Sequence, residues 1–276
     1  MTRRGGDATA GPTARSPTEE VPITRYRDKV VLITGSGAGI GRHYAHRFAA
    51  EGASIVVTDV DPAAADRVVG ELAAQERPAV GVQMDVTEAA AVQAAVDTAV
   101  ERFGGIDVLV NNAGVHLEHA QLPHTLEAVP AWRRVLEVNV LGVLTCSAAC
   151  RPAMAGRDAA IVNHSSMAAY MGGGAYSASK LALNSLTVST AAEFAADGIR
   201  VNGIAPGLVD SEAAVAWMDD PARKGIQDAL VAGQMLQRPG RMTDLADVAL
   251  WLCSPEASFV TGQTIVVDGG YLPKPV

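Results

Sequence analysis

The sequence has few aromatic residues, few cysteines and no block of basic residues. Aromatic residues make up 4% of its 276 residues, so Ala, Val, Leu and Gly must fill most of its core. A formal net charge of −8 argues against nucleic acid or an anionic membrane as partner. No apolar run reaches the length of a membrane span, and the first residues lack a signal-peptide core. The three cysteines, Cys146, Cys150 and Cys253, cannot all pair, which favours reduced thiols in a cytoplasmic protein.

Two regions differ in composition. Residues 1–28 are rich in Gly, Thr, Ala, Arg and Pro, which predicts a disordered tail. Residues 29–276 alternate short β-branched runs with Ala-rich helical stretches without a linker, which predicts a single α/β domain. Such alternation indicates a doubly wound parallel sheet of about seven strands with helices on both faces. Strands are expected at 30–33, 54–58, 80–84, 106–110, 160–163, 199–204 and 263–267, and helices at 40–51, 62–75, 88–103, 131–155, 176–196 and 243–253.

A glycine-rich turn, Thr34–Gly41, joins the first predicted strand to the first predicted helix. Glycines permit a tight turn and a close backbone approach, and the start of a helix presents free N–H groups to a pyrophosphate. The strand–turn–helix context makes a plain glycine turn the weaker interpretation. We therefore expect a dinucleotide to contact Gly35, Ser36, Gly39, Ile40 and Gly41.

Acidic residues follow the second and third predicted strands. Asp59 ends the second strand, where a carboxylate accepts hydrogen bonds from both ribose hydroxyls and repels a 2′-phosphate. Neither Ser36 nor Val60 supplies a cation for such a phosphate, so the sequence predicts NAD rather than NADP. Asp85 and Val86 end the third strand, where an adenine ring is expected, although Asp85 also fits a helix N-cap.

Tyr176 and Lys180 lie four residues apart in a predicted helix and therefore on one helical face. A phenol titrates near pH 10, and a neighbouring ammonium favours its ionised form. The pair is thus a candidate acid/base for neutral pH. By itself the spacing favours an ordinary surface helix pair, so the rest of the sequence must decide.

Several further motifs, in a fixed order over about residues 29–270, resemble the short-chain dehydrogenase/reductase family in its single-domain form. This resemblance implies a Rossmann-type fold and hydride transfer between a nicotinamide and a secondary alcohol or ketone, without a metal. The motifs are Thr34–Gly41, Asp85-Val86, Asn111–Gly114, Asn139, Ser165-Ser166, Tyr176 with Lys180, Pro206-Gly207, Thr261–Gln263 and Asp268–Gly270.

The resemblance also implies a role for each matching residue. Tyr176 would exchange a proton with the substrate oxygen, and Lys180 would lower the pKa of the phenol and hold the nicotinamide ribose. Ser166 would stabilise charge on the substrate oxygen, and Asn139 would hold a water that links Lys180 to solvent. The remaining cofactor contacts would be Asn112, Ala113, Gly114, Pro206, Gly207, Val209 and Ser211, where Ser211 replaces a usual threonine beside the carboxamide.

The expected substrate side departs from the family pattern. The segment between Ser166 and Tyr176 is short, and only one of Ser165 and Ser166 can face inward; the motif favours Ser166. Gly172–Gly174 leaves room for a ring or a bulky alcohol, or is a flexible turn.

Two further segments adjoin the expected substrate cleft. The spacing of His116, Glu118, His119 and His124 resembles that of metal ligands, but hydride chemistry needs no metal, and a metal site is disfavoured. A substrate contact through His116 is a further hypothesis for this loop, and not the favoured one. Residues 210–235 suggest a lid, in which Trp217 and Met218 either cover the substrate or pack the lid down.

Two other functions fit the sequence less well. A 3-oxoacyl-carrier-protein reductase commonly uses NADP, against which Asp59 counts, and the acidic surface suits an acidic carrier poorly. A non-catalytic dinucleotide-binding protein would be expected to lose Tyr176 or Lys180. The family commonly forms dimers or tetramers through the helices that carry Asn139 and Tyr176, and the apolar side chains of Leu181, Leu186 and Val188 permit this.

Overall fold

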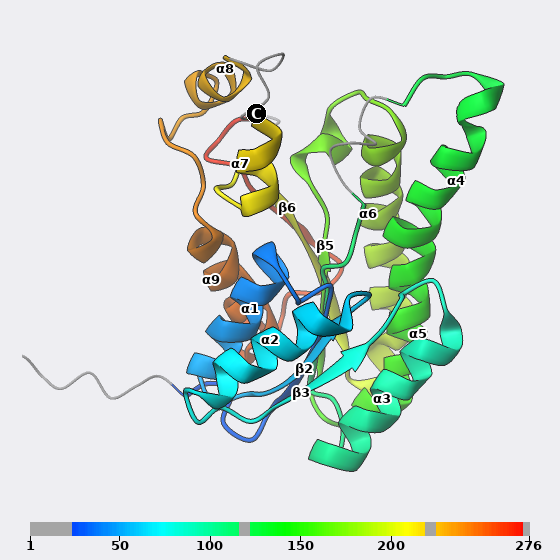
Figure 1. Cartoon of the computed structure of the whole chain (residues 1–276), viewed down its shortest axis with the longest axis vertical. Coiled ribbons are helices and arrows are strands. Elements are labelled where there is room, and N and C mark those ends of the chain that lie inside the picture. The colour runs from blue at the N-terminus through cyan, green and yellow to red at the C-terminus, as the bar shows by residue number, and fades with distance from the viewer. Residues whose placement is uncertain (1–23, 116–121, 219–224, 273–276) are drawn as a thin grey trace, which may run out of the picture.

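The computed structural model describes residues 24–115, 122–218 and 225–272 of the chain. Seven strands form one parallel sheet in the order β3-β2-β1-β4-β5-β6-β7 (Figure 1). The predicted doubly wound sheet of about seven strands is confirmed. The strands are β1 (Val30–Thr34), β2 (Ser54–Asp59), β3 (Ala79–Gln83), β4 (Val108–Asn111), β5 (Ala160–His164), β6 (Arg200–Pro206) and β7 (Thr264–Val267).

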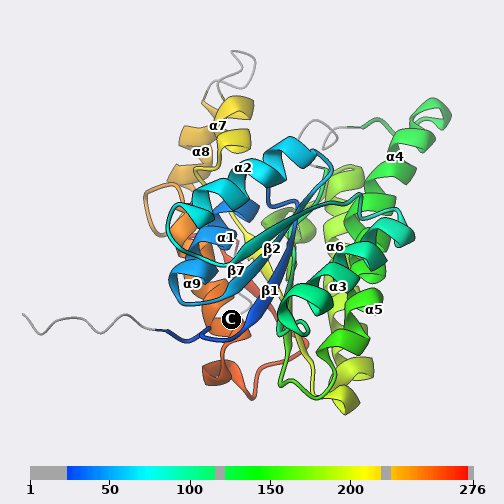
Figure 2. The same ribbon diagram turned by 60° about the horizontal axis from the view of Figure 1, so that its bottom comes forward.

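Helices cover both faces of the sheet, which is why the central strands are apolar along their whole length. Every residue of β1, β4 and β5 is buried. One face packs against α1 (Gly39–Ala50), α2 (Pro62–Ala73) and α9 (Met242–Cys253), and the other against α3 (Ala89–Phe103), α5 (Gly142–Met154) and α6 (Ala175–Phe194). Figure 2 shows the two helical layers on either side of the sheet.

The strand order reverses at β1, which pairs with β2 on one side and β4 on the other. Connections on the two sides of this point leave for opposite faces of the sheet, so a crevice opens beyond the carboxyl ends of the strands. All strands are parallel, so the residues that follow β1, β2, β4, β5 and β6 meet at one edge. The fold thereby gathers motifs that are far apart in the sequence.

The long predicted helix 131–155 has three parts. They are α4 (Val129–Leu136), a π-helical turn (Glu137–Leu141) and α5. Among the described residues, Leu126–Met154 is one helical run long and apolar enough to cross a membrane by length and composition, with 44% of its most apolar window buried. Contact between α5 and α3 buries the inner side of this run, as in the core helix of a globular domain.

In the expected lid, residues 210–235, the described residues form two helices that were not predicted from the sequence. They are α7 (Glu212–Met218) and α8 (Ile226–Ala232). Each has only seven residues, which is too short to establish a clear amphipathic period. The side chains of Trp217 and Met218 lie outside the described part of the chain, so their predicted roles stay predictions.

The tail was predicted to extend to residue 28, and its last residues instead pack on the domain. Tyr26 is buried, its ring lies 4.8 Å from that of Phe48, and its hydroxyl donates to the carbonyl oxygen of Leu250. Arg25 bonds both carboxylate oxygens of Glu51 at 2.6 Å. The boundary prediction was wrong for residues 24–28 because one aromatic residue among polar neighbours carries no periodic signal.

Candidate active site

A cleft of about 830 Å³ opens at the carboxyl ends of the strands. Most of the predicted site residues line it, including Gly39, Asp59, Ser166 and Tyr176. Lys180 and Asn139 lie behind its wall as buried side chains. The other predicted residues in the lining are Gly35, Ile40, Asp85, Val86, Asn112, Ala113, Gly114, Pro206, Gly207, Val209 and Ser211.

Ser36 was predicted to bind the cofactor, and the structure gives it a different role. Its hydroxyl donates to the carbonyl oxygen of Ile33 at 2.8 Å and accepts from the amide of Thr58 at 3.0 Å. The buried hydroxyl therefore braces β1 against β2. Ser36 is not part of the cleft lining, and its predicted cofactor contact stays a prediction.

The glycine-rich turn is shaped by close backbone contacts. A Cβ atom on Gly41 would stand 2.3 Å from the carbonyl oxygen of Gly35 and 2.5 Å from Nδ2 of Asn112, so glycine is required there. Asn112 donates from Nδ2 to the carbonyl oxygens of Thr34 and Gly35 at 3.0 and 2.9 Å. These bonds lock the predicted cofactor residue Asn112 onto the turn, beside the cleft.

This turn fits a pyrophosphate. Gly39 has a φ of +54°, and a Cβ there would meet no atom within 4 Å, so its backbone faces open space. Ala38 precedes α1 without a side-chain cap, which leaves the first N–H groups of the helix for an anion. A dinucleotide phosphate is the ligand that such a helix start accommodates.

Asp59 is held at the end of β2 by backbone donors. Its Oδ2 accepts from the amide of Gly37 at 2.9 Å, and its Oδ1 accepts from the amide of Asp61 at 3.1 Å. A carboxylate has about four acceptor positions, so it retains capacity for ribose hydroxyls. Arg67, which is not part of the cleft lining, also supports this turn by donating to the carbonyl oxygen of Gly37 at 3.2 Å.

Asp85 closes a local turn and also lines the cleft. Its Oδ1 accepts from the amide and the hydroxyl of Thr87 at 2.9 and 2.7 Å, and its Oδ2 lies 3.4 Å from Nη2 of Arg134. The hydrogen bond from the Thr87 amide is the largest cause that lowers the pKa of Asp85. Glu88, not Asp85, is the N-cap residue of α3, so the alternative of a helix cap was wrong.

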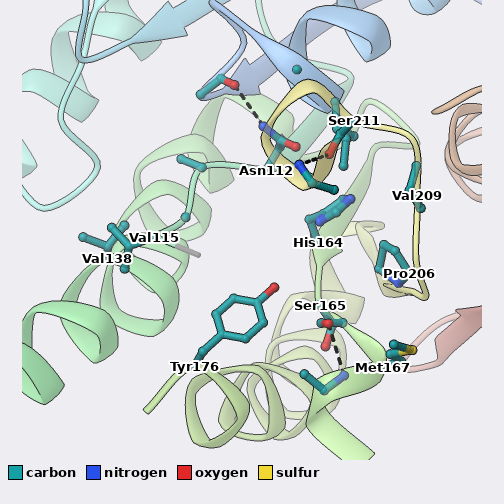
Figure 3. Close-up of a pocket in the computed structure, with 18 of the residues that line it drawn as sticks. Asn112, Val115, Val138, His164, Ser165, Met167, Tyr176, Pro206, Val209 and Ser211 are labelled. Atoms are coloured by element: carbon teal, nitrogen blue, oxygen red, sulfur yellow. Dashed lines mark hydrogen bonds between the residues drawn. The ribbon is translucent and has the colours of Figure 1, made fainter. Parts of the chain in front are cut away.

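Tyr176 lies in the first turn of α6 and directs its phenol into the cleft (Figure 3). Burial raises the pKa of this phenol, and a hydrogen bond with Ser166 lowers it. Ser166 begins a 3₁₀ turn, where its Oγ also accepts from the amide of Ala168 at 3.1 Å. Ser165 points to α6 and donates to Oδ1 of Asn184 at 2.6 Å. This geometry supports Ser166 as the serine beside Tyr176.

Lys180 occupies the buried face of α6. Its Nζ donates to the carbonyl oxygen of His164 at 2.6 Å and lies 5.6 Å from the centroid of the Tyr176 ring. Burial lowers the pKa of Lys180 to about 8. The sequence analysis expected Lys180 to lower the pKa of Tyr176. Ser166 lowers the pKa of Tyr176 through its hydrogen bond, and the effect of Lys180 on that pKa stays a prediction.

Comparisons with known proteins agree with this geometry. A family model described as "Enoyl-(Acyl carrier protein) reductase" matches residues 35–272. The chain is 38% identical over 250 residues to cis-4-hydroxycyclohexanecarboxylate dehydrogenase of Sinomonas cyclohexanicum, covering 89% of this chain and 97% of that protein. It is 35% identical to meso-2,3-butanediol dehydrogenase of Serratia marcescens, covering 89% and 95% of the two chains.

A solved structure of 7α-hydroxysteroid dehydrogenase, complexed with NADH and 7-oxo glycochenodeoxycholic acid, superposes with a TM-score of 0.84 at 33% identity. The match covers 93% of this chain and 99% of that one. The chain belongs to the short-chain dehydrogenase/reductase family. It is accordingly an oxidoreductase that uses a nicotinamide dinucleotide, and the family prediction is confirmed.

Asn139 lies in the π-helical turn, a conformation often found at functional sites of helices. Its Oδ1 accepts from the amide of Val115 at 2.9 Å, and its Nδ2 donates to the carbonyl of Val115 and to Oγ of Ser179, both at 3.1 Å. The amide therefore clamps the loop after β4 to α6. In this short-chain dehydrogenase/reductase, the side chain of Asn139 has this clamping role, and the predicted water-holding role of Asn139 stays a prediction.

A histidine and an arginine are among the cleft residues that were not predicted from the sequence. His164 ends β5 and lines the cleft, and Arg134 of α4 reaches it from beside Asp85. His164 was hidden because it stands one residue before the Ser165-Ser166 motif, within a predicted strand. Arg134 could not be recognised as a cleft residue from the sequence, because an arginine on a helix is normally solvated.

The predicted loop after β4 is described only in part. His116, Glu118 and His119 lie outside the described residues, so their predicted roles stay predictions. The ring of His124 lies 5.3 Å from that of Trp132. Gly172 and Gly173 line the cleft, as the sequence analysis expected of the short segment before Tyr176.

Proposed function

We propose that this enzyme is an NAD-preferring dehydrogenase of bulky secondary alcohols, or a reductase of the corresponding ketones, with Tyr176 as the proton-transferring group. The observation that carries the proposal is the half-buried Tyr176 phenol, hydrogen-bonded to Ser166, in the same cleft as Gly39 and Asp59. When bound there, the nicotinamide supplies or takes the hydride.

The hydroxyl groups of Tyr176 and Ser166 act on the substrate oxygen. The pKa of Tyr176 is raised by burial, so the phenol is protonated at neutral pH and acts as an acid toward a ketone oxygen. Ser166 donates a hydrogen bond to the same oxygen as it gains negative charge. In the oxidative direction the phenol must first lose its proton, which the hydrogen bond with Ser166 assists.

The preference for NAD is supported by the fixed position of Asp59. Its carboxylate would face the ribose of the adenosine half, where a 2′-phosphate would add like charge. In the variant Asp59→Ser, the ratio of kcat/KM with NADP to that with NAD is expected to rise at least about tenfold. Asp66→Asn, on α2 and away from the cleft lining, should leave the ratio unchanged. Equal rates of the wild type with NADP and NAD would contradict the proposal.

The substrate class is supported by the lining near Tyr176. Apolar side chains of Met167 and Met171, close in sequence to Gly172 and Gly173, line the cleft together with Leu208. Two of the proteins compared above act, by their names, on a ring alcohol and a steroid. Purified enzyme with NAD should oxidise cyclohexanol derivatives and sterols faster than 2,3-butanediol, as read at the nicotinamide absorbance. Turnover of small alcohols alone would contradict a bulky substrate, and Tyr176→Phe should abolish turnover.

A carrier-protein reductase is the second candidate. The description of the family model favours it, and the net charge of −8 disfavours docking of an acidic carrier. Assays with 3-oxoacyl and enoyl thioesters of acyl carrier protein, with NADH and NADPH, separate it from the first candidate. Efficient turnover of either thioester, with none of free cyclic ketones, would establish this alternative.

We also propose a homotetrameric or dimeric assembly in the cytoplasm. Apolar side chains are exposed on the outer faces of two neighbouring helices, at Leu144 on α5 and at Leu181 and Val188 on α6. All three cysteines are buried free thiols, which supports a reducing compartment. Light scattering of the wild type should give a multiple of the 28.5 kDa chain mass, and Leu181→Glu should lower it.

A further inference from the structure

Ser179 lies one turn further along α6 than Tyr176, and its side chain is fully buried. Its hydroxyl donates to the carbonyl oxygen of Tyr176 at 2.7 Å and accepts from Nδ2 of Asn139 at 3.1 Å. The hydroxyl therefore uses its one proton and one of its lone pairs. Ser179 is not part of the cleft lining, so it can influence the chemistry only through its neighbours.

The direction of these hydrogen bonds is set at the backbone of Val115. Its N–H can only donate, so Asn139 must present Oδ1 to it, at 2.9 Å. Nδ2 of Asn139 then faces the carbonyl oxygen of Val115 and the hydroxyl of Ser179, both at 3.1 Å. A carboxamide nitrogen has two protons and does not accept. The Ser179 oxygen must therefore accept from Asn139, which leaves its proton for the carbonyl of Tyr176.

The first turn of α6 needs such support. Gly174 is the N-cap residue, and without a side chain it cannot accept from the N–H groups of that turn. Two exposed glycines, Gly172 and Gly173, precede it, and glycine loses more conformational freedom on ordering than other residues. Tyr176 thus stands in a turn that tends to fray. The hydroxyl of Ser179 ties this turn down, because a serine in a helix can bond a carbonyl one turn earlier.

The surroundings of Ser179 leave little room for adjustment. Asn139 is 0% exposed, and Lys180, the next residue of α6, is held by its own hydrogen bond to β5. Gly114 packs against both side chains, because a Cβ there would stand 3.1 Å from Oδ1 of Asn139 and 3.7 Å from Nζ of Lys180. Movement at Ser179 is therefore passed on to the turn that carries Tyr176.

We propose that Ser179 is a positioning residue, which holds the phenol of Tyr176 in place by joining the first turn of α6 to Asn139 and Val115. Figure 3 shows this phenol projecting from α6 into the opening of the cleft. Any tilt of the turn displaces the hydroxyl at the far end of the side chain. A misplacement of about 1 Å can cost about 10²-fold in rate. The inference rests on the proposed role of Tyr176 in proton transfer.

Tyrosine NMR tests the position of the phenol without a substrate. The chain has five tyrosines, and with carbon-13 at Cζ the signal of Tyr176 is assigned by its loss in Tyr176→Phe. In Ser179→Ala this signal should shift or broaden, whereas the signals of the buried residues Tyr26 and Tyr44 should stay unchanged. An unchanged Tyr176 signal would overturn the inference, as would an equal disturbance of all five signals, which indicates general damage to the fold.

Further variants make the test specific for this hydroxyl. Ser179→Thr keeps a hydroxyl that can bond the same carbonyl, and it should retain the wild-type signal of Tyr176. Ser179→Cys, close in size but a weaker donor, replaces the alanine variant if that variant does not fold. In the control Ser189→Ala, the lost bond joins the hydroxyl to the carbonyl of Leu186 at 3.1 Å in the same helix, and the Tyr176 signal should not change. A response to Ser189→Ala equal to that of Ser179→Ala would overturn the inference.

Turnover of cyclohexanol with NAD gives the functional readout. Ser179→Ala should lower kcat at least about tenfold and change the calorimetric Kd of NAD by less than about twofold. Ser179→Thr should recover most of this loss. Equal losses in kcat and in NAD binding would overturn a role in positioning Tyr176. Failure of the proposed function would appear separately, as turnover by Tyr176→Phe, and the NMR result decides the inference even if cyclohexanol is not a substrate.

Discussion

Lys180 Nζ donates a 2.6 Å hydrogen bond to the carbonyl oxygen of His164, and this bond joins the N-terminal half of α6 to the end of β5. Lys180 is 2% exposed, and burial is the cause that lowers its pKa to about 8. One carbonyl compensates only part of the hydration that an ammonium loses. The site therefore keeps a cation in place at a cost to the stability of the fold.

That cost should appear in the dependence of stability on pH. The pKa of Lys180 is lowered from 10.5 to about 8 in the folded protein, so between these values the unfolded chain binds more protons. The free energy of unfolding should then rise with pH across this window. Relative to Lys180→Met, which removes the titration, the wild type should gain about 3 kcal/mol between the two limits in urea denaturation. A constant difference between the two proteins would show that Lys180 titrates normally.

Alanine substitutions at the two adjacent serines, Ser165 and Ser166, should have different effects, one on stability and the other on catalysis. Ser166→Ala should lower kcat by about 10²–10³-fold, because it removes a donor to the reacting oxygen. It should also raise the pKa of Tyr176 seen in the pH–rate profile, because the hydrogen bond with Ser166 lowers that pKa. Ser165→Ala loses the bond to Asn184 and should cost about 1 kcal/mol of stability with kcat nearly unchanged. The reverse pattern would assign the catalytic role to Ser165.

Alanine substitutions at two glycines with similar backbone conformations should differ in their effect on the dinucleotide Kd. Gly39 and Gly198 have φ values of +54° and +73°, and a Cβ at either would meet no atom within 4 Å. Alanine at either position should cost about 1 kcal/mol of stability. Only Gly39→Ala places a methyl group where the phosphate is expected, so its dinucleotide Kd should rise about tenfold or more. Equal Kd values for the two variants, measured by calorimetry, would place the phosphate elsewhere.

Asn139 should matter for the fold as well as for activity. Asn139→Ala removes three hydrogen bonds and leaves the backbone of Val115 without its side-chain partner. We expect a loss of about 2–3 kcal/mol in the free energy of unfolding, measured by urea denaturation. A role limited to holding a water would instead leave the stability of the variant close to that of the wild type.

Local patterns predicted most of the fold and the cofactor side of the cleft. Strands that are buried on both faces require continuous apolar runs, and a phosphate-binding turn requires glycines such as Gly41. The four-residue spacing of Tyr176 and Lys180 fixed their common helical face. Short helices such as α7 and the anchor at Tyr26 were missed, because neither extends over enough residues to form a period.

The sequence by itself determined the parallel sheet, the glycine turn and the identity of the chemical groups, because each depends on neighbouring residues or on one helical face. Only the tertiary structure decided which partner each of these groups contacts. It turned Ser36 inward to brace β1 and β2, paired Lys180 with the carbonyl of His164, and engaged Asn139 with Val115. It also brought the His164 imidazole to the cleft. Apart from the bond between Ser36 and Ile33, these contacts join residues far apart in the chain. Burial and hydrogen-bond geometry, which no local pattern encodes, select their partners.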